Sequence, residues 1–169
     1  TGVRIDAVEF HPAYHALMRR SVAAGLHCSA WDAGGETNTR HVTRAARLFM
    51  TAQAECGHLG PMMTTNASLA ALAHAPKLAT QWVPAIRARQ YDSSHKPAAE
   101  KSGVTLGIGI AEKQGGSDLS AIGTSAEDGR DGSWRITGHK WFLSAPMSDA
   151  FLILAKTSQG LSCFLVPRV

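Results

Sequence analysis

The sequence lacks the features that define several protein classes. Its three cysteines are odd in number and form no CxxC pair, so neither a disulfide framework nor a zinc knuckle is encoded. No apolar run approaches the roughly 18 residues that span a bilayer, and no apolar signal core follows a basic start. With 169 residues, of which 44% are hydrophobic and 18% charged, the composition is that of a globular protein. We expect a soluble, cytoplasmic protein that does not contact membranes.

Familiar catalytic and metal-binding patterns are missing as well. His11 and His15 stand four residues apart, but the glutamate of an HExxH motif is absent and a zinc site needs a third ligand. There is no Gly-x-Ser-x-Gly elbow, and Cys56 has no evident base. Glu112 and Asp118 are close in the chain, yet their setting does not fix their separation. We therefore assign no catalytic residue and no metal site in this chain.

Basic residues exceed acidic ones only before residue 104, and the net formal charge is +4. Arg40, Arg44 and Arg47 fall on one helix face, which could meet phosphate groups or be an ordinary solvated face. No recognition helix, RNP-type aromatic pair or zinc finger accompanies them. These residues give nucleic-acid binding no specific support.

Residues 1–103 carry the periodicity of helices. Helices are predicted from Pro12 to a stop at Gly25, over residues 43–56, over residues 61–73, and after Pro76. A turn-rich link covers residues 32–38. The second helix carries an apolar stripe of Ala46, Phe49, Met50 and Ala54, and the fourth is expected to bury Trp82, Val83 and Ile86. This part is predicted to be an all-α domain that ends at residue 103, after a polar segment from Tyr91 to Ser102.

Residues 104–169 change to the period of two that is typical of strands. Apolar residues alternate from Val104 to Ile110, and further β runs cover residues 134–137, 140–144, 151–156 and 162–166. Tight-turn pairs such as Asp128-Gly129 separate these runs, which favours antiparallel pairing over βαβ units. We predict an α+β protein in which a helical domain (1–103) is followed by an antiparallel, β-barrel-like domain (104–169). Both ends look cut, and we expect the chain to be a fragment of something longer.

A glycine-rich segment follows the first β run. Residues 107–118 lead from the strand into Gly115-Gly116, then into a hydroxyl and a carboxylate. Such a bend presents backbone N–H groups to an anion, and Ser117 adds a donor that can reach a phosphate. An ordinary β-turn explains the composition equally well. The glycine spacing fits neither a GxGxxG fingerprint nor a Walker A loop.

A second segment, residues 136–144, places an aromatic pair before a hydroxyl. A strand here would put Phe142 and Ser144 on one face and Trp141 and Leu143 on the other. An aromatic ring beside a short donor could lie against a planar heterocycle. A core aromatic is the alternative.

Together, AEKQGGSD and ITGHKWFLS after a helical part resemble the acyl-CoA dehydrogenase family. Within it, the segments KQGGSD, HKWFLSAPMSDAFLILAKT and GLSCFLVPR are similar to the AidB branch, the alkylation-response flavoproteins. FHPAYHALM, RAARLFMTAQAE and ARQYDSS match that branch too. The resemblance covers essentially the whole chain.

The resemblance implies FAD in a cleft between helical, β-barrel and C-terminal bundle domains. Phe142 falls where the family stacks an aromatic ring on the isoalloxazine, Ser144 where it bonds the N5/O4 edge, and Ser117 where it reaches the pyrophosphate. Ala111 stands where the family usually has Thr, so one hydroxyl is lost. The implied cofactor-binding residues are Ile108, Gly109, Ile110, Ala111, Glu112, Lys113, Gln114, Gly115, Gly116, Ser117, Phe142, Leu143 and Ser144.

The resemblance also implies an FAD-dependent oxidoreductase that dehydrogenates an acyl-CoA thioester, assembled as a homotetramer. The catalytic carboxylate of the family lies in a C-terminal bundle outside these residues. The alternative is an AidB-like flavoprotein with little turnover that contacts DNA through its C-terminal region and protects or repairs it. A third possibility is that this segment alone is an interaction module that retains no FAD.

Overall fold

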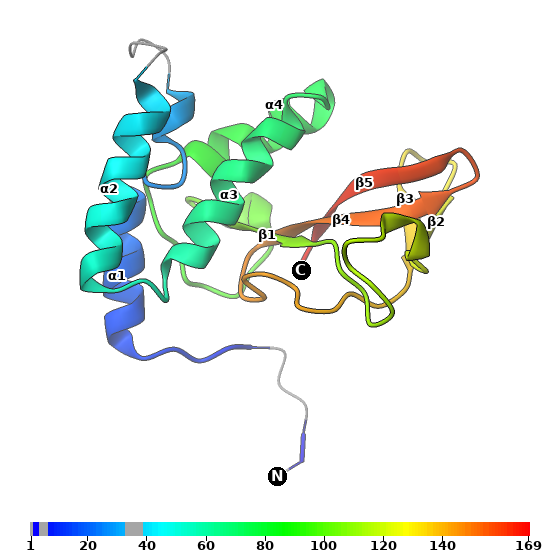
Figure 1. Ribbon diagram of the computed structural model, residues 1–169, viewed down its shortest axis with the longest axis horizontal. Coiled ribbons are helices and arrows are strands. Elements are labelled where there is room, and N and C mark those ends of the chain that lie inside the picture. Colours follow the sequence, from blue (N-terminus) through cyan, green and yellow to red (C-terminus); the bar gives the residue numbers. More distant parts are fainter. Residues whose placement is uncertain (1, 4–6, 33–38) are drawn as a thin grey trace.

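The computed structural model describes residues 2–3, 7–32 and 39–169. The link predicted over residues 32–38 therefore lies, apart from Asp32, outside the described residues. Four helices gather at one end of the molecule and the strands at the other, with the long β4–β5 hairpin pointing away from the helices (Figure 1). The elements are α1 (Pro12–Ala23), α2 (Arg40–Ala54), α3 (Leu59–Leu72), α4 (Pro76–Arg87), β1 (Leu106–Gly109), β2 (Ser125–Asp128), β3 (Trp134–Thr137), β4 (Ala150–Thr157) and β5 (Gly160–Pro167).

The helices begin and end where local chemistry dictates. The His11 side chain accepts a hydrogen bond from the Ala13 amide at the start of α1, and Pro12 occupies the first turn, where its missing N–H costs nothing. Gly25 follows α1 with φ +71°, a left-handed conformation that ends the helix. Pro76 opens α4 in the same way as Pro12 opens α1. All four helices predicted from the sequence are present.

The core consists of two clusters that join the helices to each other and to the sheet. Met18 and Val22 of α1 pack with Leu59 and Met62 around α3. A second cluster fills the space between α3, α4 and the sheet, through Leu69, Leu72, Trp82, Ile86, Leu106, Ala150 and Leu152. Because this second cluster spans both parts, the helices and the sheet share one core. The domain boundary at residue 103 stays a prediction.

The sheet is mixed, which corrects the prediction of antiparallel pairing throughout. β1 pairs parallel with β4, from Leu106 opposite Ala150 onward, and β2 pairs parallel with β4. β4 and β5 form an antiparallel hairpin, as do β2 and β3. Parallel pairing needs a long connection, and the long segment between β1 and β4 supplies it. The α+β class is confirmed, but the described strands do not close into a barrel.

Two further expectations, a strand over residues 140–144 and a buried Val83, fail, and the apolar stripe of α2 is exposed. Residues 140–144 are not a strand, because Phe142 has φ +53° and Ala145 +54°; only Ser144 pairs with Ile108, so the predicted faces of this segment do not exist. The stripe on α2 is not core, since Phe49 is 67% exposed and none of the α2 residues is buried. Val83 is only half-buried.

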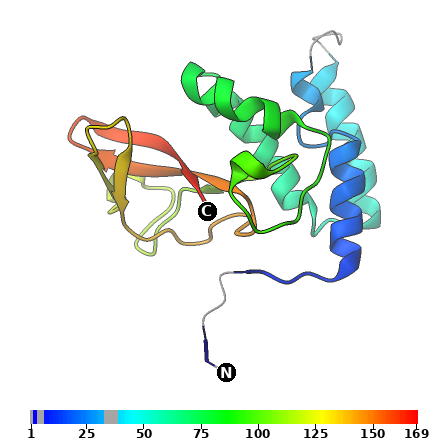
Figure 2. The same ribbon diagram turned by 180° about the vertical axis from the view of Figure 1, so that it is seen from behind.

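The view from behind shows α1 and α2 side by side at the outer edge, with α3 between them and the sheet (Figure 2). Among the described residues, no helix has the length and apolar character needed to cross a membrane.

Candidate functional site

The two motifs found in the sequence lie side by side. The Ser144 amide donates to the Ile108 carbonyl at 3.0 Å, and the Trp141 amide donates to the Ala111 carbonyl at 2.9 Å. These bonds attach residues 141–144 to the end of β1 and to the residues that follow it. The glycine-rich bend and the aromatic-hydroxyl segment are therefore parts of one surface, although they are about thirty residues apart in the chain.

Two glycines of β1 permit this close approach. A Cβ at Gly107 would collide with the Ser144 carbonyl oxygen and lie 2.7 Å from the ring of Phe151. A Cβ at Gly109 would lie 2.6 Å from Cδ1 of Leu143. Real Cβ atoms do not approach other heavy atoms so closely, hence a side chain at Gly107 would push the segment away. Because these glycines have no side chain, residues 143 and 144 can pack directly against β1.

The surface is open and rich in unused hydrogen-bond donors. Phe142 is 82% exposed and meets Trp141 edge-on, with ring centroids 5.4 Å apart. Gly116 and Ser117 are exposed, and within the described part of the chain their amides and the hydroxyls of Ser117 and Ser144 form no hydrogen bond. The arrangement offers an aromatic face beside several donors. It could hold a planar group that carries phosphates.

The remaining predicted site residues differ in what they present. Ile110 is exposed beyond the strand, whereas Leu143 is half-buried against Gly109. Lys113 and Gln114 form a turn closed by paired backbone hydrogen bonds between Glu112 and Gly115. Their backbone thus shapes the bend, and the side chain of Lys113 is exposed.

Glu112 points inward and holds the site together. Its carboxylate accepts from Lys140 Nζ at 2.7 Å, from the Gly123 amide at 2.7 Å and from the Thr124 amide at 3.1 Å, and its side chain is 4% exposed. Burial alone would raise the pKa of Glu112, but the hydrogen bonds from Lys140, Thr124, Gly123 and Gln114 outweigh it and hold the pKa well below its ordinary value. Glu112 therefore ties Lys140 to the segment beneath the bend.

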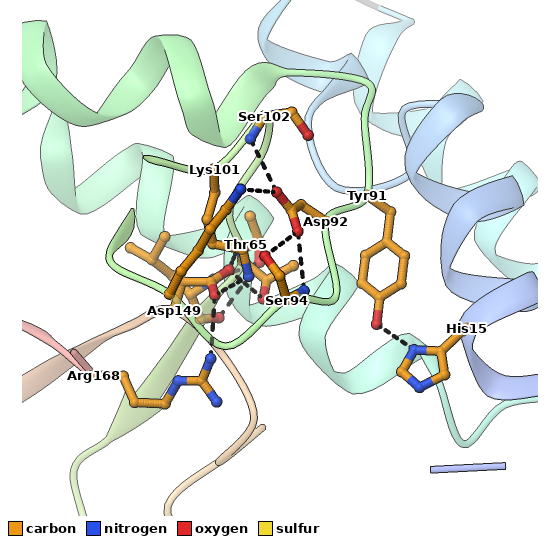
Figure 3. Close-up of polar contacts among 12 residues, drawn as sticks. His15, Thr65, Tyr91, Asp92, Ser94, Lys101, Ser102, Asp149 and Arg168 are labelled. Carbon is orange, nitrogen blue, oxygen red and sulfur yellow. Dashed lines mark hydrogen bonds and ion pairs between the residues drawn. The ribbon is translucent and has the colours of Figure 1, made fainter. Parts of the chain in front are cut away.

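A second polar cluster, which the sequence analysis missed, lies where the sheet begins (Figure 3). Asp149 accepts from Lys101 Nζ at 2.6 Å and from the Thr105 amide at 2.9 Å, and Arg168 lies 3.6 Å away. Lys101 and Asp149 are both at least 95% buried. The signal was the polar segment before residue 103, which the sequence analysis treated only as a boundary. One of its charges, Lys101, is in fact paired inside the fold, and Asp92 and Lys96 pair with each other closer to the surface.

The core also contains a chain of a hydroxyl, an imidazole and a carboxylate. Ser21 Oγ lies 2.8 Å from Nε2 of His58, whose Nδ1 lies 2.5 Å from Glu55. This is the order of groups in a nucleophilic triad. Ser21 and His58 are buried, however, so the hydroxyl faces packed side chains instead of a substrate. This series of hydrogen bonds links α1 to the start of α3.

The remaining candidates present no site. No group of three or more potential metal ligands is found among the described residues. Arg44 is not part of a free basic face, because its Nε donates to the Leu26 carbonyl at 2.7 Å.

Comparison with known proteins identifies the family. The profile of the family "Adaptive response protein AidB N-terminal domain" matches residues 1–93, and that of "Acyl-CoA dehydrogenase, middle domain" matches residues 107–169. AidB of Escherichia coli (strain K12) is 45% identical over 99% of this chain. The chain belongs to the AidB branch of the acyl-CoA dehydrogenases.

Other comparisons agree on the fold. The Caenorhabditis elegans acyl-CoA dehydrogenase family member 11 is 26% identical over 98% of this chain. The crystal structure of C. elegans ACDH-11 in complex with C11-CoA superposes with a TM-score of 0.82. The match covers 98% of this chain and 29% of the ACDH-11 chain. The apo-form of Bd2924 superposes at 0.81 with 24% identity. The chain spans 31% of E. coli AidB and 28% of the worm protein, which is about a third or less of these relatives.

Proposed function

We propose that this chain supplies one wall of an FAD site in an acyl-CoA dehydrogenase-like oxidoreductase, which removes hydrogen from the α and β carbons of an acyl-CoA thioester. The observation that carries the proposal is that exposed residues after β1 (Ile110, residues 113–114 and residues 116–117) lie beside the partly exposed segment 142–144, which is hydrogen-bonded to the end of β1. The family supports it, and ACDH-11 has been crystallised with C11-CoA. The acyl-CoA substrate rests on these relatives, and a homo-oligomeric assembly rests on the family resemblance alone.

The residues present fit an FAD. A flavin needs a flat apolar contact, donors at its ring edge and donors at its phosphates. The exposed ring of Phe142 offers the first, the free hydroxyl of Ser144 the second, and the free amides of Gly116 and Ser117 the third. Backbone N–H groups in a bend favour anions because they present partial positive charge. Of the two carboxylates at this bend, Glu112 is neutralised by Lys140, and Asp118 accepts hydrogen bonds from the amide and the hydroxyl of Ser120.

Each residue then has a distinct task. Phe142 would pack on the isoalloxazine ring, Ser144 would donate to its N5/O4 edge, and Ser117 would donate to the pyrophosphate. Lys140 and Glu112 hold the two segments in register from below. A bound flavin would be the hydride acceptor. Hydrogen-bond donors at the ring edge stabilise the reduced, electron-rich form of the flavin. At this edge Ala111 lacks the hydroxyl that the usual Thr would supply.

The acyl-CoA part is tested with the full-length protein. Addition of an acyl-CoA should bleach the visible absorbance of bound flavin, and a series of chain lengths should reveal the preferred substrate. If protein that carries FAD shows no bleaching with any chain length, the proposed acyl-CoA substrate is wrong, whereas the proposed FAD site is unaffected.

The cofactor part is tested separately. Phe142→Ala should raise the dissociation constant for FAD about tenfold, the weight of one aromatic stacking contact. Phe49→Ala is the matched control, because Phe49 is a similarly exposed phenylalanine on α2. If both variants bind FAD like the unmodified protein, Phe142 does not touch the ring.

The DNA-binding alternative has no observation on its side within the described residues. Asp32 pairs with Arg87 at 3.3 Å and with Arg89 at 2.5 Å, and Arg44 bonds the backbone. Three of the basic residues are thus already bound by partners within the chain. We do not propose DNA binding for this chain.

A further inference from the structure

A cavity of about 130 Å³ lies where the helices meet the sheet, and nothing in the proposed function uses it. We call it the junction cavity. An apolar cavity of about 150 Å³ is large enough to hold benzene, so this one accommodates a ligand of several heavy atoms. Its walls include Phe10, Tyr14, Met18, Lys101, Met147 and Arg168.

The junction cavity is separate from the proposed FAD wall. Thr105, which precedes β1, lines the cavity, whereas the FAD wall begins within β1 and continues past Ile110. The two share no residue, although Met147 of the cavity stands only three residues after Ser144 of the wall.

The acceptors around the cavity are already occupied. Asp149 accepts from Lys101 and from the Thr105 amide. Asp92 accepts from the Ser94 amide at 3.0 Å and pairs with Lys96 at 3.3 Å. Figure 3 shows Asp149 beside Lys101, and Asp92 beside Ser94 and Ser102. A cation or a hydrogen-bond donor would find no free carboxylate here.

Two donors, in contrast, are buried without a partner. Tyr14 and Arg168 both line the cavity, and the Tyr14 hydroxyl and Nε of Arg168 are buried and make no hydrogen bond, whereas Nη2 of Arg168 lies 3.6 Å from Asp149. Burial, with the nearby Tyr91 and Glu55 as lesser causes, raises the pKa of Tyr14 to about 12, so the hydroxyl keeps its proton. The guanidinium of Arg168 is permanently charged. Because unpaired buried polar groups are unfavourable, an acceptor in the cavity would be bound by both.

The apolar part of the wall defines the rest of the ligand. The rings of Phe10 and Tyr14 stack with centroids 4.0 Å apart, and Met18 and Met147 complete the wall. Arginine recognises carboxylates through the planar fork of its guanidinium. We propose that the junction cavity binds a small carboxylic acid as its anion, with the carboxylate on Tyr14 and Arg168 and its carbon skeleton on Phe10 and the methionines.

Benzoate is the probe, added to the full-length protein with FAD bound. Equilibrium dialysis should show saturable benzoate binding, and the thermal midpoint should rise with benzoate concentration. Tyr14→Phe and Arg168→Lys should each weaken benzoate at least about tenfold, the weight of a hydrogen bond to a charged group. Benzamide, which has the same shape without the charge, should bind far more weakly. Arg135→Lys, on exposed β3, is the matched control and should leave benzoate binding unchanged.

The ligand-free protein separates a binding role from a structural one. Tyr14→Phe should leave its thermal midpoint unchanged or raised, because it removes an unpaired hydroxyl. Tyr91→Phe should lower it, because the Tyr91 hydroxyl lies 2.9 Å from Nδ1 of His15 in a formed hydrogen bond.

Several results would overturn the proposal. These are no saturable benzoate binding, equal binding by Tyr14→Phe and Arg168→Lys, or a lowered midpoint for ligand-free Tyr14→Phe. If inorganic phosphate bound as tightly as benzoate, the apolar wall would contribute nothing to the affinity, and the assignment to carboxylic acids would be wrong. Flavin absorbance in the same samples reports FAD binding independently.

Discussion

Replacing Gly107 with alanine tests whether the two halves of the proposed FAD wall depend on their close approach. The added Cβ would collide with the Ser144 carbonyl oxygen and lie 2.7 Å from Cδ1 of Phe151. Overpacking of this kind costs about 1–3 kcal/mol, and separating the Ser144 amide from the Ile108 carbonyl removes about 1 kcal/mol more. We expect a total loss of about 3 kcal/mol in the free energy of unfolding of this part of the protein.

Thermal unfolding of the full-length variants measures the effect. Gly107→Ala should lower the midpoint by several degrees and weaken FAD, because Ser144 moves away from β1. Gly60→Ala is the control: it lies in α3 with open space around it, and alanine in a helix gains about 0.5–1 kcal/mol over glycine. A Gly107→Ala protein with an unchanged midpoint and full FAD content would refute this reasoning.

Three more changes have defined outcomes. Lys140→Met leaves the buried carboxylate of Glu112 unpaired and should cost about 3–5 kcal/mol in urea unfolding at neutral pH. The pKa of Glu112 is held below its ordinary 4.5, so ionised Glu112 contributes fully to the free energy of unfolding above pH 4.5. This contribution is lost as pH falls through the lower pKa of the folded state. The acid unfolding curve of Glu112→Gln should therefore lack this pH-dependent loss of stability. Ser21→Ala removes the partner of buried His58 and should cost about 1–3 kcal/mol by the same urea measurement, and an unchanged value would mean that the bond contributes nothing. Ala111→Thr should raise the two-electron flavin potential by roughly 20 mV in dye-linked reduction, the equivalent of about 1 kcal/mol, whereas a lowered potential would contradict a donor at the ring edge.

The helices could be predicted because local chemistry decides them. Pro12 and Pro76 mark helix starts, and Trp82 and Ile86, predicted to be buried on α4, are in the core. Parallel pairing of β1 with β4 could not be predicted, because strand order depends on contacts between distant segments. The exposure of Phe49 shows the limit of periodicity: a stripe of apolar residues does not say whether another element covers it.

The residues of the candidate site stay a prediction, although the two motifs are hydrogen-bonded to each other through Ser144 and Ile108 and through Trp141 and Ala111. The conformation of Phe142, with its positive φ, was not predictable from a strand-like pattern. The inward position of Glu112 depends on Lys140, whose place opposite the bend exists only in the folded chain. The cluster around Asp149 combines residues from three distant segments, which no local pattern connects.

Hydrogen–deuterium exchange of the full-length protein, with and without FAD, tests the central claim most directly. If the glycine-rich bend and the aromatic-hydroxyl segment form one wall of the flavin site, peptides that cover residues 107–118 and 140–145 should both gain protection when FAD binds, while the β4–β5 turn at residues 158–159 should not change. FAD-dependent protection that spares both segments, or that covers only one of them, would contradict a shared flavin wall.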